Sequence, residues 1–157
     1  MKGIVINKVM VENGDDLSKP LVETLEVSIQ VFDDLNAQSL FFSPFFVEHW
    51  DKNPFRSHER LYPIDFGAPL EETMLISIRL PSGFTVEEIP EKVALLLPDG
   101  GGKYIFGAQM LQDKIVINNT LVLSRTIYAA SEYYVLKELF NRILQVQNID
   151  LVLKRTN

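Results

Sequence analysis

The chain has 157 residues, of which 46% are hydrophobic and 23% are charged, the composition of an ordinary globular protein of one domain. Its formal net charge of −6 argues against nucleic acid or an anionic membrane surface as a partner, because both attract clustered Lys and Arg. It has no cysteine, which excludes disulfides, thiolate metal sites and a thiol nucleophile. No apolar run approaches the ~18 residues of a membrane span, so we expect no membrane insertion.

Most of the chain alternates apolar and polar residues, which is typical of strands with one buried face. The alternation is clearest in residues 25–31 and 73–80. Further β-rich segments, in chain order, are residues 4–11, 39–46, 93–98, 103–110, 114–118 and 120–124. Strands of this length, separated by Pro, Gly, Asn and Asp, predict an antiparallel sandwich or barrel.

The sequence PDGGGK, residues 98–103, separates two of these segments. Its glycines tolerate positive φ angles, so the stretch predicts a hairpin turn. The Gly-Lys pair at its end also invites comparison with a phosphate-binding loop. That motif needs Gly and Ser or Thr where this chain has Leu97 and Tyr104, so we favour the turn.

Near the C-terminus the period changes. Residues 130–148 place apolar side chains at helical spacing, with Ser131 as the expected N-cap, and residues 149–154 alternate again as a last strand. The apolar stripe consists of Leu136, Leu139, Phe140, Ile143 and Val146. We therefore predict a mainly β fold over residues 1–157 as a single domain: an antiparallel β-sandwich of seven to nine strands with one C-terminal α-helix.

Aromatic residues crowd into positions 41–66. We expect most of these rings to fill the core, because a large exposed aromatic patch would favour aggregation. The alternative is a glycan- or peptide-binding module centred on Trp50, whose neighbours are His49 and Asp51. Its candidate binding residues are Trp50, Phe55, Arg60 and Tyr62.

Residues 53–67, NPFRSHERLYPIDFG, combine two prolines with charged and aromatic side chains. Pro54 and Pro63 restrict the backbone, so we interpret the segment as a structured connection between strands. We predict that Arg60 and Asp65 form its central lock. The expected anchors to the sandwich are Phe55, Tyr62 and Phe66.

Catalytic and metal sites are not expected. The chain has only two histidines, His49 and His58, and no G-x-S-x-G motif that would place a nucleophilic serine beside them. With Asp51 and Glu59 the histidines form a formal zinc or iron ligand set, but their spacing matches no compact metal motif. We therefore predict a protein that is not an enzyme and needs no metal or cofactor.

Four segments together carry a resemblance to a known family. Residues 53–67, 78–92, 97–106 and 131–155 resemble the C-terminal domain of unknown function that follows a transglutaminase-like core in large exported bacterial proteins. The resemblance covers roughly residues 15–155. It implies that chemistry belongs to the papain-like core, with its Cys-His-Asp triad, and that this module is a non-catalytic accessory domain. No functional residues are established for such modules, so none is carried over.

The resemblance also implies partners and a location. The partners would be neighbouring domains of the same parent protein, or another protein. The location would be the periplasm or the outside of the cell, although residues 1–16 do not contain the apolar run of a signal peptide. We accordingly expect an accessory module excised from a larger protein.

Overall fold

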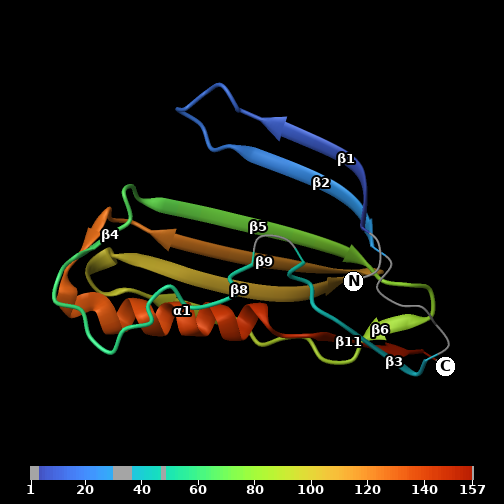
Figure 1. The fold of residues 1–157 in the computed structure, drawn as a ribbon. Helices are drawn as coiled ribbons and strands as arrows, with labels where there is room; N and C mark the ends of the chain where they lie inside the picture. Colours follow the sequence, from blue (N-terminus) through green and yellow to red (C-terminus); the bar gives the residue numbers. More distant parts are fainter. Residues whose placement is uncertain (1–3, 30–36, 47–48, 157) are drawn as a thin grey trace. The chain divides into compact units, whose positions relative to one another are not determined.

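The computed structural model describes residues 4–29, 37–46 and 49–156. As predicted, this part of the chain is mainly β, with antiparallel sheets and one α-helix near the C-terminus (Figure 1). Contacts divide the chain into two compact units, residues 1–37 and 38–157. That the two units form a single domain stays a prediction.

The first unit is a β-hairpin. Strands β1 (Ile4–Glu12) and β2 (Val22–Ile29) pair antiparallel, with a register shift between Ile6 and Lys8. In the turn, the Asp16 carboxylate accepts hydrogen bonds from the Ser18 hydroxyl and backbone N–H. Short polar side chains that bind their own backbone in this way are typical of turns.

The second unit is built on a four-stranded antiparallel sheet. Its order is β5 (Leu70–Arg79), β9 (Lys114–Leu123), β8 (Gly102–Leu111) and β7 (Val93–Leu96). Along β8 and β9 nearly every second residue is buried, as the period-two pattern predicts. The buried face carries Tyr104, Phe106, Ala108, Ile115, Ile117, Leu121 and Leu123.

A second layer covers this buried face. Figure 1 shows helix α1 (Tyr133–Gln147) and a three-stranded sheet following one another along the same side of the large sheet. The small sheet has the order β3 (Ser39–Phe42), β11 (Leu151–Arg155) and β6 (Phe84–Val86). The layer opposite the large sheet therefore combines a helix with short strands.

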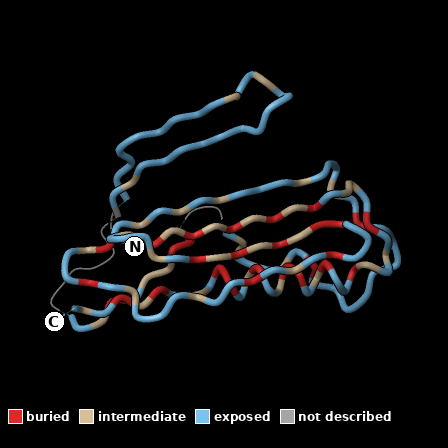
Figure 2. Tube along the Cα trace, turned by 180° about the vertical axis from the view of Figure 1, so that it is seen from behind, coloured by how far each residue is buried: buried red, intermediate tan, exposed pale blue. Residues whose placement is uncertain are grey.

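The core lies between these layers, where Figure 2 shows the buried residues on the sheet and the helix facing each other. The predicted helical stripe is confirmed, since all five of its residues are buried. Two further strands, β4 (Ile64–Asp65) and β10 (Ile127–Tyr128), form a small separate ladder. No helix among the described residues is long and apolar enough to cross a membrane.

Among the turns and strands predicted from the sequence, some are confirmed and others end at different residues. The predicted turn is confirmed, because β7 and β8 pair antiparallel across a 3₁₀ turn at Pro98–Gly100. The segment predicted as strand 39–46 ends at Phe42, since a proline follows at position 44 and cannot donate to a sheet ladder. Residues 30 and 31 of the predicted strand 25–31 lie outside the described residues.

The start of the helix also differs from the prediction. Ser131 lies inside a 3₁₀ turn, Ala130–Glu132, and is not the N-cap. The residue before α1 is Glu132, whose carboxylate reaches back to accept the backbone N–H of Ala129 at 2.8 Å. The acid thus satisfies a donor that would otherwise lack a partner where the chain enters the helix.

Candidate functional site

Residues 49–58 form a strap that runs along α1 in the opposite direction to the helix. The backbone N–H of Trp50 donates to the side-chain oxygen of Gln147, in the last turn of α1, at 2.8 Å. At the other end, the hydroxyls of Tyr133 and Tyr134 donate to the carbonyls of Ser57 and His58. Residues far apart in the sequence thereby fix the strap at both ends of the helix.

Asn53 binds the middle of the strap to the helix. Its amide nitrogen donates to the carbonyl of Lys137 at 2.9 Å and to the side-chain oxygen of Asn141 at 2.7 Å. Its own side-chain oxygen accepts the N–H of Phe55 at 2.8 Å. One half-buried amide thus uses donors and acceptor together, which makes it the best-connected side chain of the strap.

Aromatic rings reinforce the same contact. Phe55 is buried and makes edge-to-face contacts with Phe66, Tyr133 and Phe140, at centroid distances of 5.3 to 6.3 Å. Trp50 is half-buried and meets Phe140 edge-on at 5.0 Å. These tilted arrangements are the favourable ones for aromatic packing. Phe55 and Phe66 are therefore anchors, as expected.

The predicted lock between Arg60 and Asp65 is wrong, because the described residues contain no ion pair between them. Arg60 is exposed and donates instead to the carbonyls of Tyr62 and Pro63, while Asp65 accepts the N–H of Gly67 at 2.8 Å. Each satisfies nearby backbone, which is the easier geometry for a side chain in a turn. Tyr62 is not an anchor either, since 76% of its surface is exposed.

The two histidines do not converge on a site. His49 lies 3.0 Å from the carboxylate of Asp51, and both are exposed; His58 is exposed and its carbonyl is engaged by Tyr134. Within residues 4–29, 37–46 and 49–156, no three His, Asp or Glu side chains are grouped so as to hold a metal ion. A hollow of about 450 Å³ beside Trp50 is lined by His49, Trp50, Asp51, Lys52, Pro54 and Arg56.

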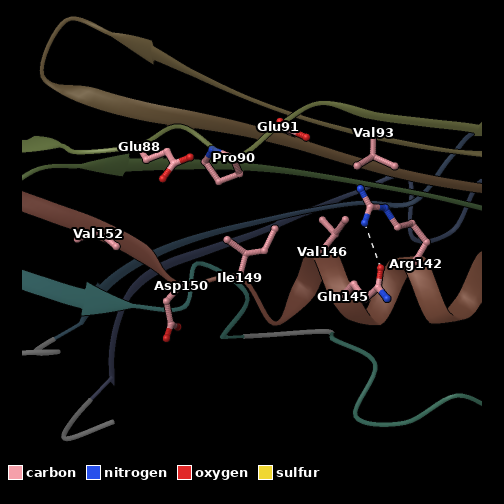
Figure 3. A pocket seen from close by; sticks show the side chains of 10 residues that line it. All are labelled: Glu88, Pro90, Glu91, Val93, Arg142, Gln145, Val146, Ile149, Asp150 and Val152. Atoms are coloured by element: carbon pink, nitrogen blue, oxygen red, sulfur yellow. Dashed lines mark hydrogen bonds between the residues drawn. The ribbon is translucent and has the colours of Figure 1, made fainter.

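A larger hollow opens near the C-terminal end of α1, between the segment before β7 and the connection from α1 to β11 (Figure 3). Its volume is about 520 Å³, within the range of ligand-sized sites. Its lining residues are Glu88, Pro90, Glu91, Val93, Arg142, Gln145, Val146, Ile149, Asp150 and Val152. Five of these lining residues are apolar and five are polar or charged.

A third cluster fixes the turn between β7 and β8. The buried Tyr128 hydroxyl donates to the carbonyl of Gly101, and the Arg125 guanidinium lies 4.6 Å from the centre of the Tyr128 ring. Arg125 also pairs with Glu132. A Cβ atom at Gly101 would come within 2.5 Å of the Arg125 guanidinium and 3.1 Å of the Pro98 carbonyl oxygen, so the guanidinium would have to shift to make room for it.

The electrostatics of this cluster stabilise the ionised acid. Burial alone would raise the pKa of Glu132, but the N–H of Ala129 and the guanidinium of Arg125 outweigh it and hold that pKa below its usual value. The glutamate therefore stays charged at neutral pH and holds the start of α1 to the turn. Among the described residues, the Nε of Arg125 is the one buried polar side-chain atom of this cluster without a hydrogen-bond partner.

The most exposed apolar surface lies on the hairpin. In the β1–β2 register, Ile6 faces Val27 and Val9 faces Leu25. Cross-strand partners and alternate residues share a face, so the hairpin presents one apolar face. Its described members are Ile4, Ile6, Val9, Val11, Leu25 and Val27, of which all but the half-buried Val27 are exposed. The opposite face carries the Lys8–Glu26 pair together with the exposed apolar residues Val5, Met10 and Val22.

Comparison with known families gives one match. The model of the family described as a domain of unknown function with solved structure, DUF3858, matches residues 38–153, most of the chain. The chain belongs to the DUF3858 family. The matched residues coincide closely with the second compact unit, so the strap, both hollows and the four-stranded sheet all lie in the DUF3858 domain.

A solved structure has a similar fold. It is described as a putative protease from Parabacteroides distasonis ATCC 8503, with a TM-score of 0.54 and 14% sequence identity. The match covers 63% of this chain and 19% of the other, so the likeness concerns one part of a much longer chain. No curated protein matches the chain.

Sequence reasoning missed most of the residues that hold the DUF3858 domain's strap in place. Asn53, Gln147 and the two tyrosines at the start of α1 were not singled out for this role. Their partners lie 76 to 97 positions away in the sequence, so no local pattern announces them. The one available signal was Gln147, a polar residue next to the last position of an apolar helical stripe.

Proposed function

We propose that the chain is a non-catalytic accessory domain of a larger exported, transglutaminase-like protein, and that it acts through contact with neighbouring domains or another protein. Membership of DUF3858 supports this context, as does the recurrence of the fold as 19% of a longer putative protease. The sequence lacks a cysteine, so it has no thiol with which to carry out papain-like chemistry itself. The proposed location is the periplasm or the cell exterior.

One observation carries the contact role: the exposed apolar face of the β1–β2 hairpin. Val9 and Leu25, directly opposite each other, remain 55% and 48% exposed. An isolated two-stranded hairpin is at best marginally stable in water, and contiguous exposed apolar patches mark interaction sites. The face therefore needs a covering surface, and in an accessory domain that surface belongs to a neighbouring domain or partner protein.

The glycan- or peptide-binding alternative gains less support. A glycan-binding site of this kind needs aromatic rings whose faces are exposed. Trp50 is half-buried and Phe55 is buried, and their described ring contacts are edge-on. Tyr62 and Arg60 are exposed, but they lie in the following part of the loop and make no described contact with Trp50. We therefore favour the hairpin face over the aromatic loop as the surface that binds a partner.

A matched pair of variants tests the contact role in the protein that the complete reading frame encodes. Val9→Ser with Leu25→Ser removes apolar area from the exposed face, and Lys8→Ser with Glu26→Ser alters the adjacent pair on the opposite face. We expect hydrogen exchange of β1 and β2 to speed up at least tenfold in the first variant, because lost apolar burial weakens docking. The second variant should exchange as the parent does. Equal exchange in all three proteins would contradict the proposal.

The non-catalytic part has its own test. The purified chain is expected to hydrolyse neither amide nor ester substrates, because it has no assembled nucleophile and base. His49→Ala and His58→Ala serve as the controls. Turnover that either substitution abolished would show that the chain is an enzyme after all.

A further inference from the structure

Strand β5 is an unusually open edge. It lies at the end of the order β5-β9-β8-β7, so within the described residues β9 is its only strand partner. The strand is ten residues long and contains no Pro, Gly or Lys, and its pairing with β9 is regular throughout. Proteins usually protect such edges with short strands, prolines, lysines or bulges, because a free edge pairs with other strands.

The side chains of β5 show that the core is unfinished at this edge. Met74, Ile76 and Ile78 point to the same face as the core residues of β9 and pair directly with Asn119, Ile117 and Ile115. Those three β9 residues are buried, whereas all three β5 residues are only half-buried. On the other face, Leu75 is 73% exposed. Another strand placed beside β5 would bury apolar surface on both faces of the sheet.

The sequence of β5 is complementary to itself. When two β5 strands run antiparallel with Leu75 opposite Leu75, residue i faces residue 150 − i of the other copy. Glu71 then faces Arg79, Thr73 faces Ser77, and Met74 faces Ile76. Opposite charges and paired apolar side chains at directly facing positions stabilise a sheet. The two-fold axis makes each of these contacts twice.

We propose that two copies of this chain associate through their β5 edges in this register, so that two four-stranded sheets join into one sheet of eight strands. A ten-residue antiparallel pair makes about ten backbone hydrogen bonds, which is typical of a specific interface. Met74 and Ile76 of each copy meet across the axis and extend the core, while Glu71 and Arg79 form the outer ion pairs.

Neighbouring registers are less favourable. Pairing must preserve the faces of the sheet, so the alternatives shift residue i to face 148 − i or 152 − i. The first places Glu71 opposite Ser77, and the second places Arg79 opposite Thr73. Only the register centred on Leu75 pairs Glu71 with Arg79, although it also places Glu72 opposite Ile78, and it therefore defines the test.

Sedimentation equilibrium of the full chain measures the association, and charge exchange tests the register. Glu71→Arg alone, or Arg79→Glu alone, places two like-charged pairs in the dimer and should raise its Kd roughly tenfold or more. The double variant Glu71→Arg with Arg79→Glu restores two opposite-charged pairs and should return the Kd to near that of the parent. Thermal unfolding of each variant confirms that the substitutions, at exposed positions, leave the chain folded.

Two controls separate this interface from other sources of association. Asp113 lies 3.5 Å from Arg79 in the same chain, so Asp113→Asn removes that intrachain contact and is expected to leave the Kd unchanged. Val9→Ser with Leu25→Ser tests for association through the hairpin and should likewise leave it unchanged. A monomer at all concentrations, or a dimer that the double charge exchange fails to restore, would overturn the proposal. So would a dimer that only the hairpin variant disrupts.

Discussion

Asn53 shows how much a single amide holds in place. Its side chain forms hydrogen bonds to Lys137, Asn141 and Phe55 at the same time. It therefore connects the strap to α1 and also links two residues within the strap. Arg60, which looked more important in the sequence, is exposed and reaches only nearby carbonyls. The two residues differ in burial. Losing a hydrogen bond costs most stability where the remaining partner is buried and cannot form a hydrogen bond to water instead.

Substitution of these two residues makes the comparison quantitative. Asn53→Ala is expected to lower the free energy of unfolding by about 1–3 kcal/mol, because it strands partly buried backbone groups of the strap and helix. Arg60→Ala, the matched control in the same loop, should change it by less than about 0.5 kcal/mol, as for other exposed positions. Urea denaturation measures both. Equal losses would mean that Arg60 has a structural role that its contacts do not reveal.

Glu132 links stability to pH. Its pKa is held below the ordinary value of 4.5, so its pairing with Arg125 and Ala129 contributes stability above that value and loses it as the pH falls through the folded-state pKa. The difference in unfolding free energy between the parent and Glu132→Gln should therefore be greatest near neutral pH and shrink below pH 4.5. A constant difference from pH 7 to pH 3, measured by urea denaturation, would exclude this origin.

At the scale of elements, β8 and β9 share a polar pair inside the core. The Tyr104 hydroxyl donates to the side-chain oxygen of Asn119 at 2.7 Å, and both residues are buried. Burial raises the pKa of Tyr104 above its usual range, so the hydroxyl remains a donor at all ordinary pH values. Each group satisfies the other in a place where water is excluded.

Removing both partners of that pair should therefore cost less than the sum of removing each one alone. Tyr104→Phe leaves the oxygen of Asn119 buried without its donor and should reduce the unfolding free energy by about 1–3 kcal/mol. Tyr104→Phe combined with Asn119→Leu removes the polar groups together and should be less destabilised than the sum of the single variants. Chemical denaturation of Tyr104→Phe, Asn119→Leu and the double variant gives the coupling free energy between the two side chains. Simple additivity would argue that the two groups do not depend on each other.

The long strands were predictable because each buries one face. Alternation along residues 73–80 and 103–110 predicted β5 and β8, and the helical stripe predicted α1. The short strands β4, β6 and β10, of two or three residues, contain too little sequence to show a period. Their positions follow from tertiary contacts, such as the pairing of β6 with β11 nearly seventy residues later.

At the scale of the whole molecule, the sequence predicted the class of fold better than its layering. Antiparallel sheets and a C-terminal helix were expected and are present. The predicted β-sandwich with a C-terminal helix did not say where that helix would lie, and α1 forms much of the layer that faces the large sheet. The apolar stripe of α1 faces one side only, so the helix had to cover a sheet; which part it would cover could not be inferred from periodicity.

The candidate site was less predictable than the fold. In the sequence, the charged and aromatic side chains at positions 49–66 stand out, whereas the open surfaces are the hairpin face and the β5 edge. Both consist of ordinary β-sheet residues, which look in sequence like any half-buried strand. They differ from other strands only in what lies beside them among the described residues: the hairpin face has no covering layer, and the β5 edge has no second strand partner.

The edge-on contact between Trp50 and Phe140 has a practical consequence. Trp50 is the only tryptophan of the chain, and its backbone is bound to Gln147 at the end of α1. Indole emission should thus report specifically on whether this segment remains seated against the helix. A red shift of this emission that precedes the loss of far-ultraviolet circular dichroism would show that the strap separates from α1 while the sheets remain folded. The fluorescence of Trp50 therefore reports on local opening of the strap without any added label.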